Sequence, residues 1–287
     1  MRNSPAPMSF LDRIAECNAH GLSRFLPFVV AGARVGWVRH DRVARLTRSG
    51  AFAVRGDALV LDPALRTFAQ RSAALAGIVA ALAAEGVIRQ PRGEFYPVTT
   101  AWTAKPLAKL ERTAVPYFGV CAWGVHMTGF VRRRDGLHVW VPRRAKDRPT
   151  YPGELDNTVA GGQPIGLGFV ANLIKECREE ASIPAALARK AVAVGCLGYT
   201  LESEEGLKPD RQMCFDLELP RGFTPVSEEG EHESFALWPV ARAMRRVRDT
   251  RDFKFNCNLV LIDFFVRHGL IGPDDGDYAA ICRGLRR

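Results

Sequence analysis

The stretch that decides the fold runs from residue 160 to residue 184 and reads AGGQPIGLGFVANLIKECREEASIP. Apolar residues recur in it at intervals of three and four, which predicts an α-helix over residues 169–181. The predicted apolar stripe of this helix consists of Val170, Leu173, Ile174, Cys177 and Ala181. Gly161 and Gly162 precede the helix by a short loop. The segment therefore predicts a glycine-containing loop followed by an amphipathic helix.

Three glutamates lie on a face of the predicted helix beside the apolar stripe. Glu176, Glu179 and Glu180 are spaced i, i+3 and i+4, so their side chains converge. Each like-charged pair costs roughly 0.2–0.5 kcal/mol on an exposed helix, so the trio is a poor device for stabilising a helix. A hard divalent cation would remove the repulsion, and Mg²⁺ takes carboxylate oxygens while keeping waters for a phosphate ligand. The spacing therefore favours a divalent-metal site.

A solvated mixed-charge face is the alternative interpretation of this helix. Lys175 and Arg178 lie among the acids and offset their charge. The glycine pair upstream favours a site, because glycine lets backbone carbonyls or amides approach a metal ion or a phosphate closely. A metal ion bound here could polarise a phosphoryl oxygen and activate a water molecule.

Together, the loop and the helix resemble the Nudix box, whose pattern is Gly-x5-Glu-x7-Arg-Glu-U-x-Glu-Glu-x-Gly-U, with U aliphatic. Counted from Gly161, the spacing fits throughout, and residues 175–180 read KECREE at the position of the core. Three residues depart from the pattern: Leu167 replaces the first Glu, Lys175 replaces Arg and Ser182 replaces Gly. All three glutamates of the core are present, so the resemblance implies a catalytically competent Nudix hydrolase.

The resemblance also implies a fold and roles for individual residues. The metal ion, Mg²⁺ or Mn²⁺, would be held by Glu176, Glu179, Glu180 and the backbone carbonyl of Gly161. Catalysis would depend on Glu176, Glu179 and Lys175, and Glu176 or a later glutamate would accept the proton of the attacking water. The implied fold is α+β, a Nudix α/β/α sandwich with a mixed sheet, preceded by a smaller N-terminal α+β domain.

Further motifs resemble one two-domain Nudix subfamily. They are Gly124-Val125-His126, Tyr151-Pro152-Gly153, Leu155-Asp156-Asn157, Asp216-Leu217-Glu218-Leu219-Pro220, Ile262-Asp263-Phe264 and Arg267-His268-Gly269-Leu270. Members of this group, some of them fused to thiamine pyrophosphokinase, are known as diphosphatases of damaged thiamine diphosphate. The resemblance implies hydrolysis of the oxo or oxy form to the monophosphate and phosphate.

Other functions stay open at this point. A pyrophosphatase of nucleotide-sugar or dinucleotide diphosphates would use the same helix. An isopentenyl diphosphate isomerase is similar in fold, but it uses a cysteine in the strand leading to the metal loop, and residues 156–160 (DNTVA) contain none. A non-catalytic Nudix-like binding module is disfavoured, because the three core glutamates are retained.

Two residues outside the box are candidates for substrate binding. Arg144 precedes the metal loop and could hold a phosphate through its guanidinium fork, with surface solvation as the competing interpretation. His126 lies in an apolar segment, GVHMTGF, where a hydrogen-bonded core histidine is the competing interpretation.

Acidic and aromatic residues elsewhere are weaker candidates. Glu231 or Glu233 could supply a distal carboxylate, but both lie in EEGEHESF, which is also typical of a solvated acidic loop. Trp37, Trp102 and Trp123 could stack on a heteroaromatic substrate, although burial in a core is the commoner fate of tryptophan.

A segment bounded by prolines, residues 103–116, divides the predicted elements into two groups. We therefore expect an N-terminal α+β accessory domain over residues 1–112 and a Nudix hydrolase domain over residues 113–287. In the first group, helices are predicted over 12–20 and 67–85, and strands over 28–30, 35–38, 51–54 and 58–61. In the second group, helices are predicted over 169–181, 259–268 and 278–285, and strands over 118–125, 137–141, 191–199 and 213–217.

Composition limits the class of partner. The net charge is +9, but the arginines are scattered and form no long basic run, which favours a solvated arginine-rich surface first, a small phosphate-bearing partner second and nucleic acid last. No stretch approaches the roughly 18 consecutive apolar residues of a membrane span, and the first 17 residues lack the apolar core of a signal peptide. Seven cysteines, none in a C-x-x-C pair, predict reduced thiols. We expect a cytoplasmic enzyme whose partner is a small-molecule diphosphate, without nucleic-acid or membrane partners; a homodimer is left open.

Overall fold

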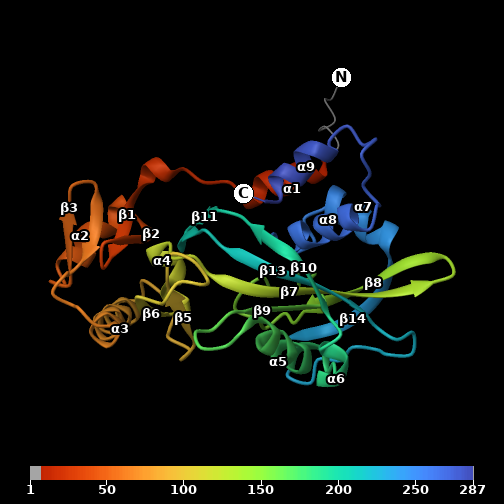
Figure 1. Cartoon of the computed structure of the whole chain (residues 1–287), viewed down its shortest axis with the longest axis horizontal. Helices are drawn as coiled ribbons and strands as arrows, with labels where there is room; N and C mark the ends of the chain where they lie inside the picture. Colours follow the sequence, from red (N-terminus) through yellow and green to blue (C-terminus); the bar gives the residue numbers. More distant parts are fainter. Residues whose placement is uncertain (1–7, 287) are drawn as a thin grey trace.

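The computed structural model describes residues 8–286. The prediction about a signal peptide concerned the first 17 residues, and residues 1–7 of that segment lie outside the described range. Figure 1 shows a smaller lobe, formed by residues 25–120, beside a larger lobe built on a mixed β-sheet. The chain is therefore α+β, as predicted.

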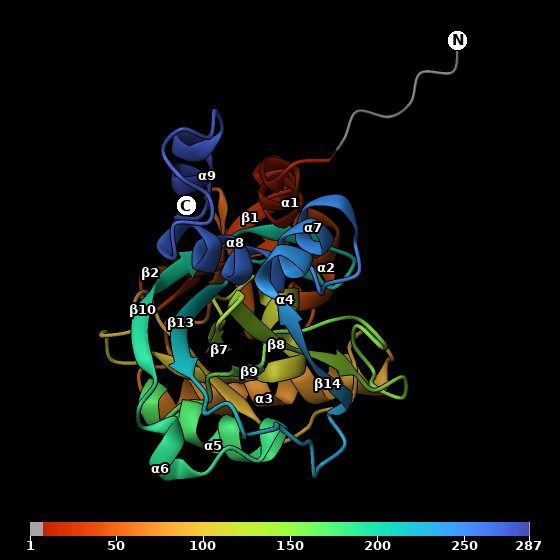
Figure 2. The same cartoon turned by 90° about the vertical axis from the view of Figure 1, so that its right-hand side faces the viewer.

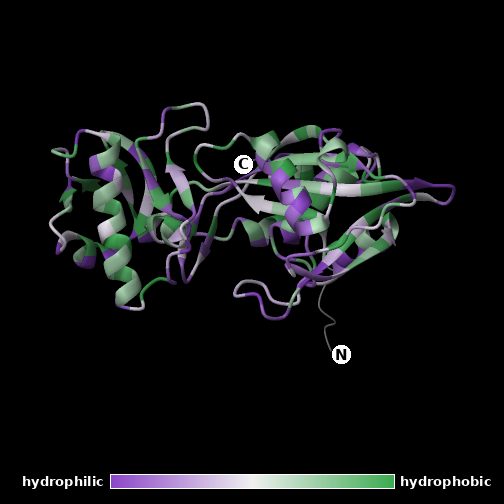
Figure 3. Cartoon of the chain, turned by 90° about the horizontal axis from the view of Figure 1, so that it is seen from below, coloured by the Kyte–Doolittle hydropathy of each residue, from purple (hydrophilic) through white to green (hydrophobic). Residues whose placement is uncertain are grey.

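The smaller lobe is a four-stranded sheet covered by a long helix. Its elements are the 3₁₀ helix η1 (Leu22–Arg24), β1 (Phe25–Val30), β2 (Ala33–Arg39), α2 (His40–Thr47), β3 (Phe52–Arg55), β4 (Ala58–Leu61) and α3 (Phe68–Ala84). The strand order is β2-β1-β4-β3. Strands β1 and β2 form one antiparallel hairpin and β3 and β4 another, and their turns contain Ala31, Gly32 and Gly56, which all have positive φ. Figure 3 shows α3, coloured mostly as hydrophobic, running along this lobe; its Leu75 and Val79 are buried in the core.

A two-stranded hairpin, which was not predicted, lies where the lobes meet. It consists of β5 (Phe95–Val98) and β6 (Ala108–Glu111), followed by the 3₁₀ helix η2 (Arg112–Ala114) and the helical turn α4 (Val115–Phe118). The strand predicted over residues 118–125 is therefore wrong in its first half. The turn ends at Gly119, which is left-handed with φ 56°, and a Cβ there would overlap the carbonyl oxygen of Trp37. This close approach requires glycine.

The larger lobe contains the predicted mixed sheet. Its elements are β7 (Trp123–Arg133), β8 (Gly136–Arg144), β9 (Val159–Gly162), α5 (Phe169–Ala181), α6 (Ala185–Ala188), β10 (Val192–Gly198), β11 (Leu201–Ser203), β12 (Gly206–Lys208), β13 (Arg211–Glu218), β14 (His232–Pro239), α7 (Val240–Asp249), α8 (Cys257–Arg267) and α9 (Tyr278–Gly284). The strand order is β10-β13-β7-β8-β14, and β9 pairs with β7. Strands β13 and β7 are parallel, whereas β10, β8 and β9 pair antiparallel with their neighbours.

Helices cover both faces of this sheet, as expected for an α/β/α sandwich (Figures 1 and 2). On one face, α5 and α6 pack on a core that contains Val125, Met127 and Leu173. On the other face lie α7, α8 and α9, together with the N-terminal helix α1 (Phe10–Cys17). Ile14 and Cys17 of α1 are buried in the core of these C-terminal helices. Residues before the smaller lobe thus pack on the larger one, and the domain boundary at residue 112 stays a prediction.

Three of the subfamily motifs meet in an ion-pair network that joins α8 to β13. Arg267 pairs through Nε with Asp263 Oδ2 at 2.6 Å and through its terminal nitrogens with Asp216. Arg286 Nη2 lies 2.8 Å from Asp263 Oδ1. Asp263 is only 1% exposed, so its charge depends on these partners. These motifs therefore stabilise the fold and do not line the site described next.

Candidate metal and diphosphate site

Helix α5 carries the three glutamates and is held by its apolar face. Leu173, Cys177 and Ala181 of the predicted stripe are buried, but Val170 is 57% exposed, so its assignment to the stripe is wrong. The buried position in the first turn belongs instead to Asn172, whose Nδ2 donates to the carbonyl of Gly162 at 2.8 Å. A polar residue within the apolar stripe was the signal for this contact. Asn172 thereby fixes the glycine loop to the helix.

The helix ends where the box pattern has its second glycine. Ser182 stands there, and it adopts the left-handed conformation with φ 50°. This conformation is the usual C-terminal cap of a helix and favours glycine. The substitution therefore leaves the backbone geometry of the motif intact.

The three glutamates lie against the loop in different ways. Glu180 is 8% exposed, and its Oε2 accepts a hydrogen bond from the Ala160 amide at 2.8 Å. Glu176 lies so close to Gly161 that a Cβ on that glycine would overlap its carboxylate. Glu179 Oε2 lies 2.7 Å from Lys175 Nζ, which is also 3.2 Å from Glu176 Oε1. The ammonium of Lys175 thus lies between two carboxylates.

The electrostatics of this cluster favour a cation. Burial raises the pKa of Glu180 well above its usual range, and the charge of Glu176 adds to the shift. Burial also raises the pKa of Glu176, against the opposing charge of Lys175. Both carboxylates are therefore short of positive charge in their surroundings.

A hard divalent ion fits this donor set. Its ligands would be carboxylate oxygens beside a backbone that only glycine allows to come so close. Within residues 8–286, no three Asp, Glu, His or Cys side chains are already arranged as ligands of a single ion. In this structure Glu179 pairs with Lys175 and Arg178, and Glu180 accepts a hydrogen bond from the Ala160 amide. Lys175 acts as a stand-in cation, and Glu179 would have to rotate away from it to reach an ion.

A cavity of about 450 Å³ opens beside the glutamates. Its basic lining residues are Arg92, Arg112, Arg144, Arg148, Lys175, Lys208, Arg211 and Lys254. Its aromatic lining residues are Tyr96, Trp123, Tyr151, Tyr199 and Phe255. The site therefore combines carboxylates for a metal ion, cations for phosphate and aromatic surfaces for an organic group.

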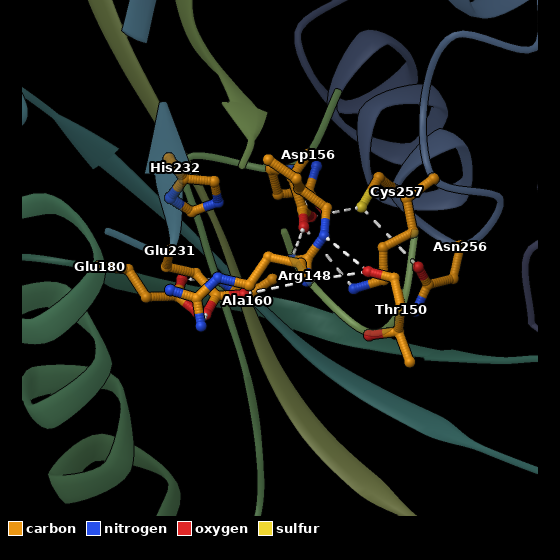
Figure 4. Close-up of polar contacts among 12 residues, drawn as sticks. Arg148, Thr150, Asp156, Ala160, Glu180, Glu231, His232, Asn256 and Cys257 are labelled. Atoms are coloured by element: carbon orange, nitrogen blue, oxygen red, sulfur yellow. Dashed lines mark hydrogen bonds and ion pairs between the residues drawn. The ribbon is translucent and has the colours of Figure 1, made fainter. Parts of the chain in front are cut away.

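Arg144 lies at the cavity but is already engaged by carboxylates. Its Nη1 is 2.9 Å from Asp156 Oδ2, and its Nη2 is 2.9 Å from Glu231 Oε1. Burial raises the pKa of Asp156, but the positive charges of Lys254 and Arg144 outweigh this effect and hold the pKa well below its usual range. Asp156 also accepts a hydrogen bond from Cys257 Sγ at 2.8 Å (Figure 4). Substrate binding by Arg144 stays a prediction, and its observed contacts are those of a buried ion-pair network.

Glu231 and Glu233 occupy different environments. Glu231 lines the cavity, pairs with Arg148 at 3.1 Å, and lies next to Glu180 in Figure 4. The charge of Glu231 contributes to the raised pKa of Glu180, which agrees with their proximity. Glu233 is exposed. Of the two, only Glu231 is placed to act as a distal carboxylate.

His126 is buried in the sheet floor of the cavity. Its Nδ1 lies 2.8 Å from Asn157 Oδ1, and its Nε2 lies 2.9 Å from Gln212 Nε2. Burial lowers the pKa of His126 to about 4, so the ring is neutral at physiological pH. Both ring nitrogens have protein partners, and substrate binding by His126 itself stays a prediction. Gln212 was not predicted as a site residue, although its buried amide lies in strand β13 next to the apolar Met213.

Comparison with known proteins adds the family. Residues 9–122 match a family described as a domain of unknown function (DUF4743). The chain is 39% identical over 297 aligned residues to Nudix hydrolase 20, chloroplastic, of Arabidopsis thaliana, covering 99% of this chain and 79% of that protein. It is 38% identical to Nudix hydrolase 24, chloroplastic, of the same plant, covering 99% and 80%.

Solved structures with a similar fold include the Nudix domain of Shewanella oneidensis NrtR complexed with ADP ribose. That structure has a TM-score of 0.41 and 13% identity, and the match covers 53% of this chain and 90% of that chain. The family assignment rests on the two plant relatives, which align with nearly the whole chain. The chain belongs to the Nudix hydrolase family, whose members use divalent metal ions, and it is a hydrolase acting on pyrophosphate bonds.

Proposed function

We propose that this protein is a metal-dependent diphosphatase of damaged thiamine diphosphate, which hydrolyses the oxo or oxy form to the monophosphate and phosphate. The observation that carries this proposal is the single cavity that joins the α5 glutamates to basic and aromatic walls. The thiamine assignment is supported by the subfamily motifs, of which Gly124-Val125-His126 and Tyr151 contribute residues to that cavity.

The proposed roles follow the positions of the side chains. Mg²⁺ or Mn²⁺ would be held by Glu176, Glu179, Glu180 and the Gly161 carbonyl. When bound, such an ion polarises a phosphoryl oxygen and activates water. Lys175, once released from Glu179, would place its ammonium against the diphosphate. A carboxylate of the cluster, Glu176 or Glu231, would accept the proton from the attacking water.

Selectivity between intact and damaged substrate is the test of the proposal. We expect kcat/KM for oxothiamine or oxythiamine diphosphate to exceed that for thiamine diphosphate by about tenfold to a hundredfold, or about 1–3 kcal/mol. For the oxo form the reason is charge: intact thiamine carries a cationic thiazolium ring, whereas the oxo form is neutral there, and burying a cation without a counter-charge of its own is costly. The measurement is competition at equal concentrations, following each monophosphate.

The result separates substrate from chemistry. Equal rates on the intact and damaged compounds, or a clear preference for a nucleotide-sugar or dinucleotide diphosphate, would remove the thiamine assignment and leave the pyrophosphate hydrolysis standing. Absence of metal-dependent phosphate release from the whole panel would contradict the catalytic proposal itself.

The compartment and partners are part of the same proposal. No helix in residues 8–286 has the length and apolar character to cross a membrane. The two plant relatives are named as chloroplastic. For this chain we propose a cytoplasmic location, in keeping with its reduced thiols, a small-molecule diphosphate as the partner and no nucleic-acid partner, and we leave a homodimer open.

A further inference from the structure

The floor of the cavity leads away from the metal loop across three strands. Gly162 of β9 pairs with Gly124 of β7, and Gly124 pairs with Gln212 of β13. Gln212 therefore lies two strand spacings, about 10 Å, from the loop. A diphosphate bound at the α5 glutamates would extend its organic group over this part of the floor.

Gln212 is held by a chain of hydrogen bonds beneath the floor. The Asn157 side-chain oxygen is 2.8 Å from His126 Nδ1, and His126 Nε2 is 2.9 Å from Gln212 Nε2. In a neutral imidazole one nitrogen donates and the other accepts. Nδ1 therefore donates to Asn157, and Nε2 accepts from the amide nitrogen of Gln212. In this arrangement the amide nitrogen is the end of Gln212 that faces His126.

The other end of the amide is an acceptor without a donor. Gln212 is 2% exposed and lines the cavity, and among residues 8–286 no group donates a hydrogen bond to its Oε1. Buried acceptors in native proteins are nearly always satisfied, because leaving one unpaired is costly. A substrate donor in the cavity would supply the missing partner.

The surroundings of Gln212 indicate the class of group that would bind. The same cavity is lined by three aromatic side chains, Tyr151, Tyr199 and Phe255. The centroid of the Phe255 ring lies 5.6 Å from that of Tyr151 and 5.5 Å from that of Tyr199. The carboxylate of Asp210, also in the lining, accepts a hydrogen bond from Tyr199 at 2.8 Å. This end of the cavity thus offers aromatic surfaces and oxygen acceptors, which suits a heteroaromatic ring that carries N–H donors.

We infer that Gln212 Oε1 accepts a hydrogen bond from an amino group or ring N–H on the heterocycle of the substrate, and that His126 is the positioning residue that presents it. The inference rests on the proposed function, since it assigns the pyrimidine of a thiamine-type substrate to this end of the cavity. The oxo form offers its amino group and the oxy form its ring N–H, so both damaged substrates can make the contact.

The test uses a matched pair of substrates, oxothiamine diphosphate and the same compound without its pyrimidine amino group. We expect wild-type kcat/KM to favour the amino compound by about tenfold or more, because a site built around a hydrogen bond rejects an analogue that lacks it. Gln212→Leu is expected to bring this ratio close to one. His126→Phe is expected to lower the ratio as well, because the amide is then free to rotate, and thermal unfolding checks that each variant is folded.

Controls make each outcome decisive. Gln90→Leu is the same substitution at an exposed position outside the cavity, and it should keep the wild-type ratio. The inference would be overturned if the wild-type ratio of the two kcat/KM values were near one, or if Gln212→Leu left that ratio unchanged. In either case, hydrolysis of both compounds would still uphold the proposed function. If the enzyme hydrolysed benzyl diphosphate but none of the thiamine compounds, that result would overturn the proposed function, and the inference with it. The wild-type ratio decides the matter even where a variant does not fold.

Discussion

Glu179→Gln and Glu180→Gln are each expected to lower kcat by about a hundredfold or more, which corresponds to on the order of 3 kcal/mol in the barrier. Each substitution preserves the size of the side chain and removes one negative charge from the α5 face. An amide is a poorer ligand for a hard divalent ion than a carboxylate. The measurement is phosphate release from the best diphosphate substrate at saturating Mg²⁺ or Mn²⁺.

The stability of Glu180→Gln without metal distinguishes a lost ligand from a damaged fold. Burial and the charge of Glu176 raise the pKa of Glu180 in the folded protein, so the ionised form destabilises the fold at pH values above its unfolded pKa. The neutral amide is therefore expected to raise the unfolding temperature by a few degrees in EDTA, on the order of 1 kcal/mol. Metal should stabilise the wild type more than the variant.

A control is available on an exposed loop. Glu228 is exposed and outside the cavity, so Glu228→Gln should change neither turnover nor the response to metal. Near-wild-type turnover of Glu179→Gln or Glu180→Gln at saturating metal would show that the assignment of metal ligands is wrong.

The parts of the fold that could be predicted are those with a local signal. The period of α5 and the spacing of its glutamates are properties of thirteen consecutive residues, and the helix lies where the pattern places it. The sandwich and its mixed sheet followed from the resemblance of the same segment to the Nudix box. Local patterns failed where packing decided the conformation: Val170 has the apolar character of a core residue, yet Asn172 takes the buried position.

The parts of the site that could not be predicted depend on contacts between distant segments. Arg144 finds its partners at Asp156 and Glu231, and the second of these lies on a different loop. Gln212 meets His126 across 86 residues of sequence through the parallel pairing of β13 with β7. Neither pairing leaves a trace in residue spacing, because spacing reports only on neighbours within one helix or strand.

The contact between the β5–β6 hairpin and the metal loop also joins distant segments, and disrupting it has a large expected effect. The Ile165 amide donates to the carbonyl of Phe95 at 2.8 Å, and a Cβ on Gly162 would overlap the hydroxyl of Tyr96. Tyr96 is 4% exposed, so it cannot easily move aside. Gly162 in turn lies beside Gly161, whose carbonyl is a predicted metal ligand.

Gly162→Ala is therefore expected to lower kcat/KM by roughly a hundredfold, because displacing a catalytic loop by about 1 Å can cost that much. Kinetics on the best diphosphate substrate measure the loss. Gly168→Ala is the matched control: it changes another glycine before the same helix, where a Cβ meets no atom within 4 Å, and it should leave activity unchanged.

A second substitution attributes the loss to the hairpin itself. Tyr96→Phe removes the hydroxyl that the new methyl group would overlap, so the double variant Gly162→Ala/Tyr96→Phe should recover about tenfold of the lost kcat/KM. The recovery is partial, because the ring carbon that bears the hydroxyl would still lie 2.8 Å from the methyl group. Additive losses in the double variant would mean that the two residues act independently. Recovery would mean that Tyr96 of the β5–β6 hairpin sets the position of the metal loop. The smaller lobe would then be part of the active site, although it supplies none of the predicted metal ligands.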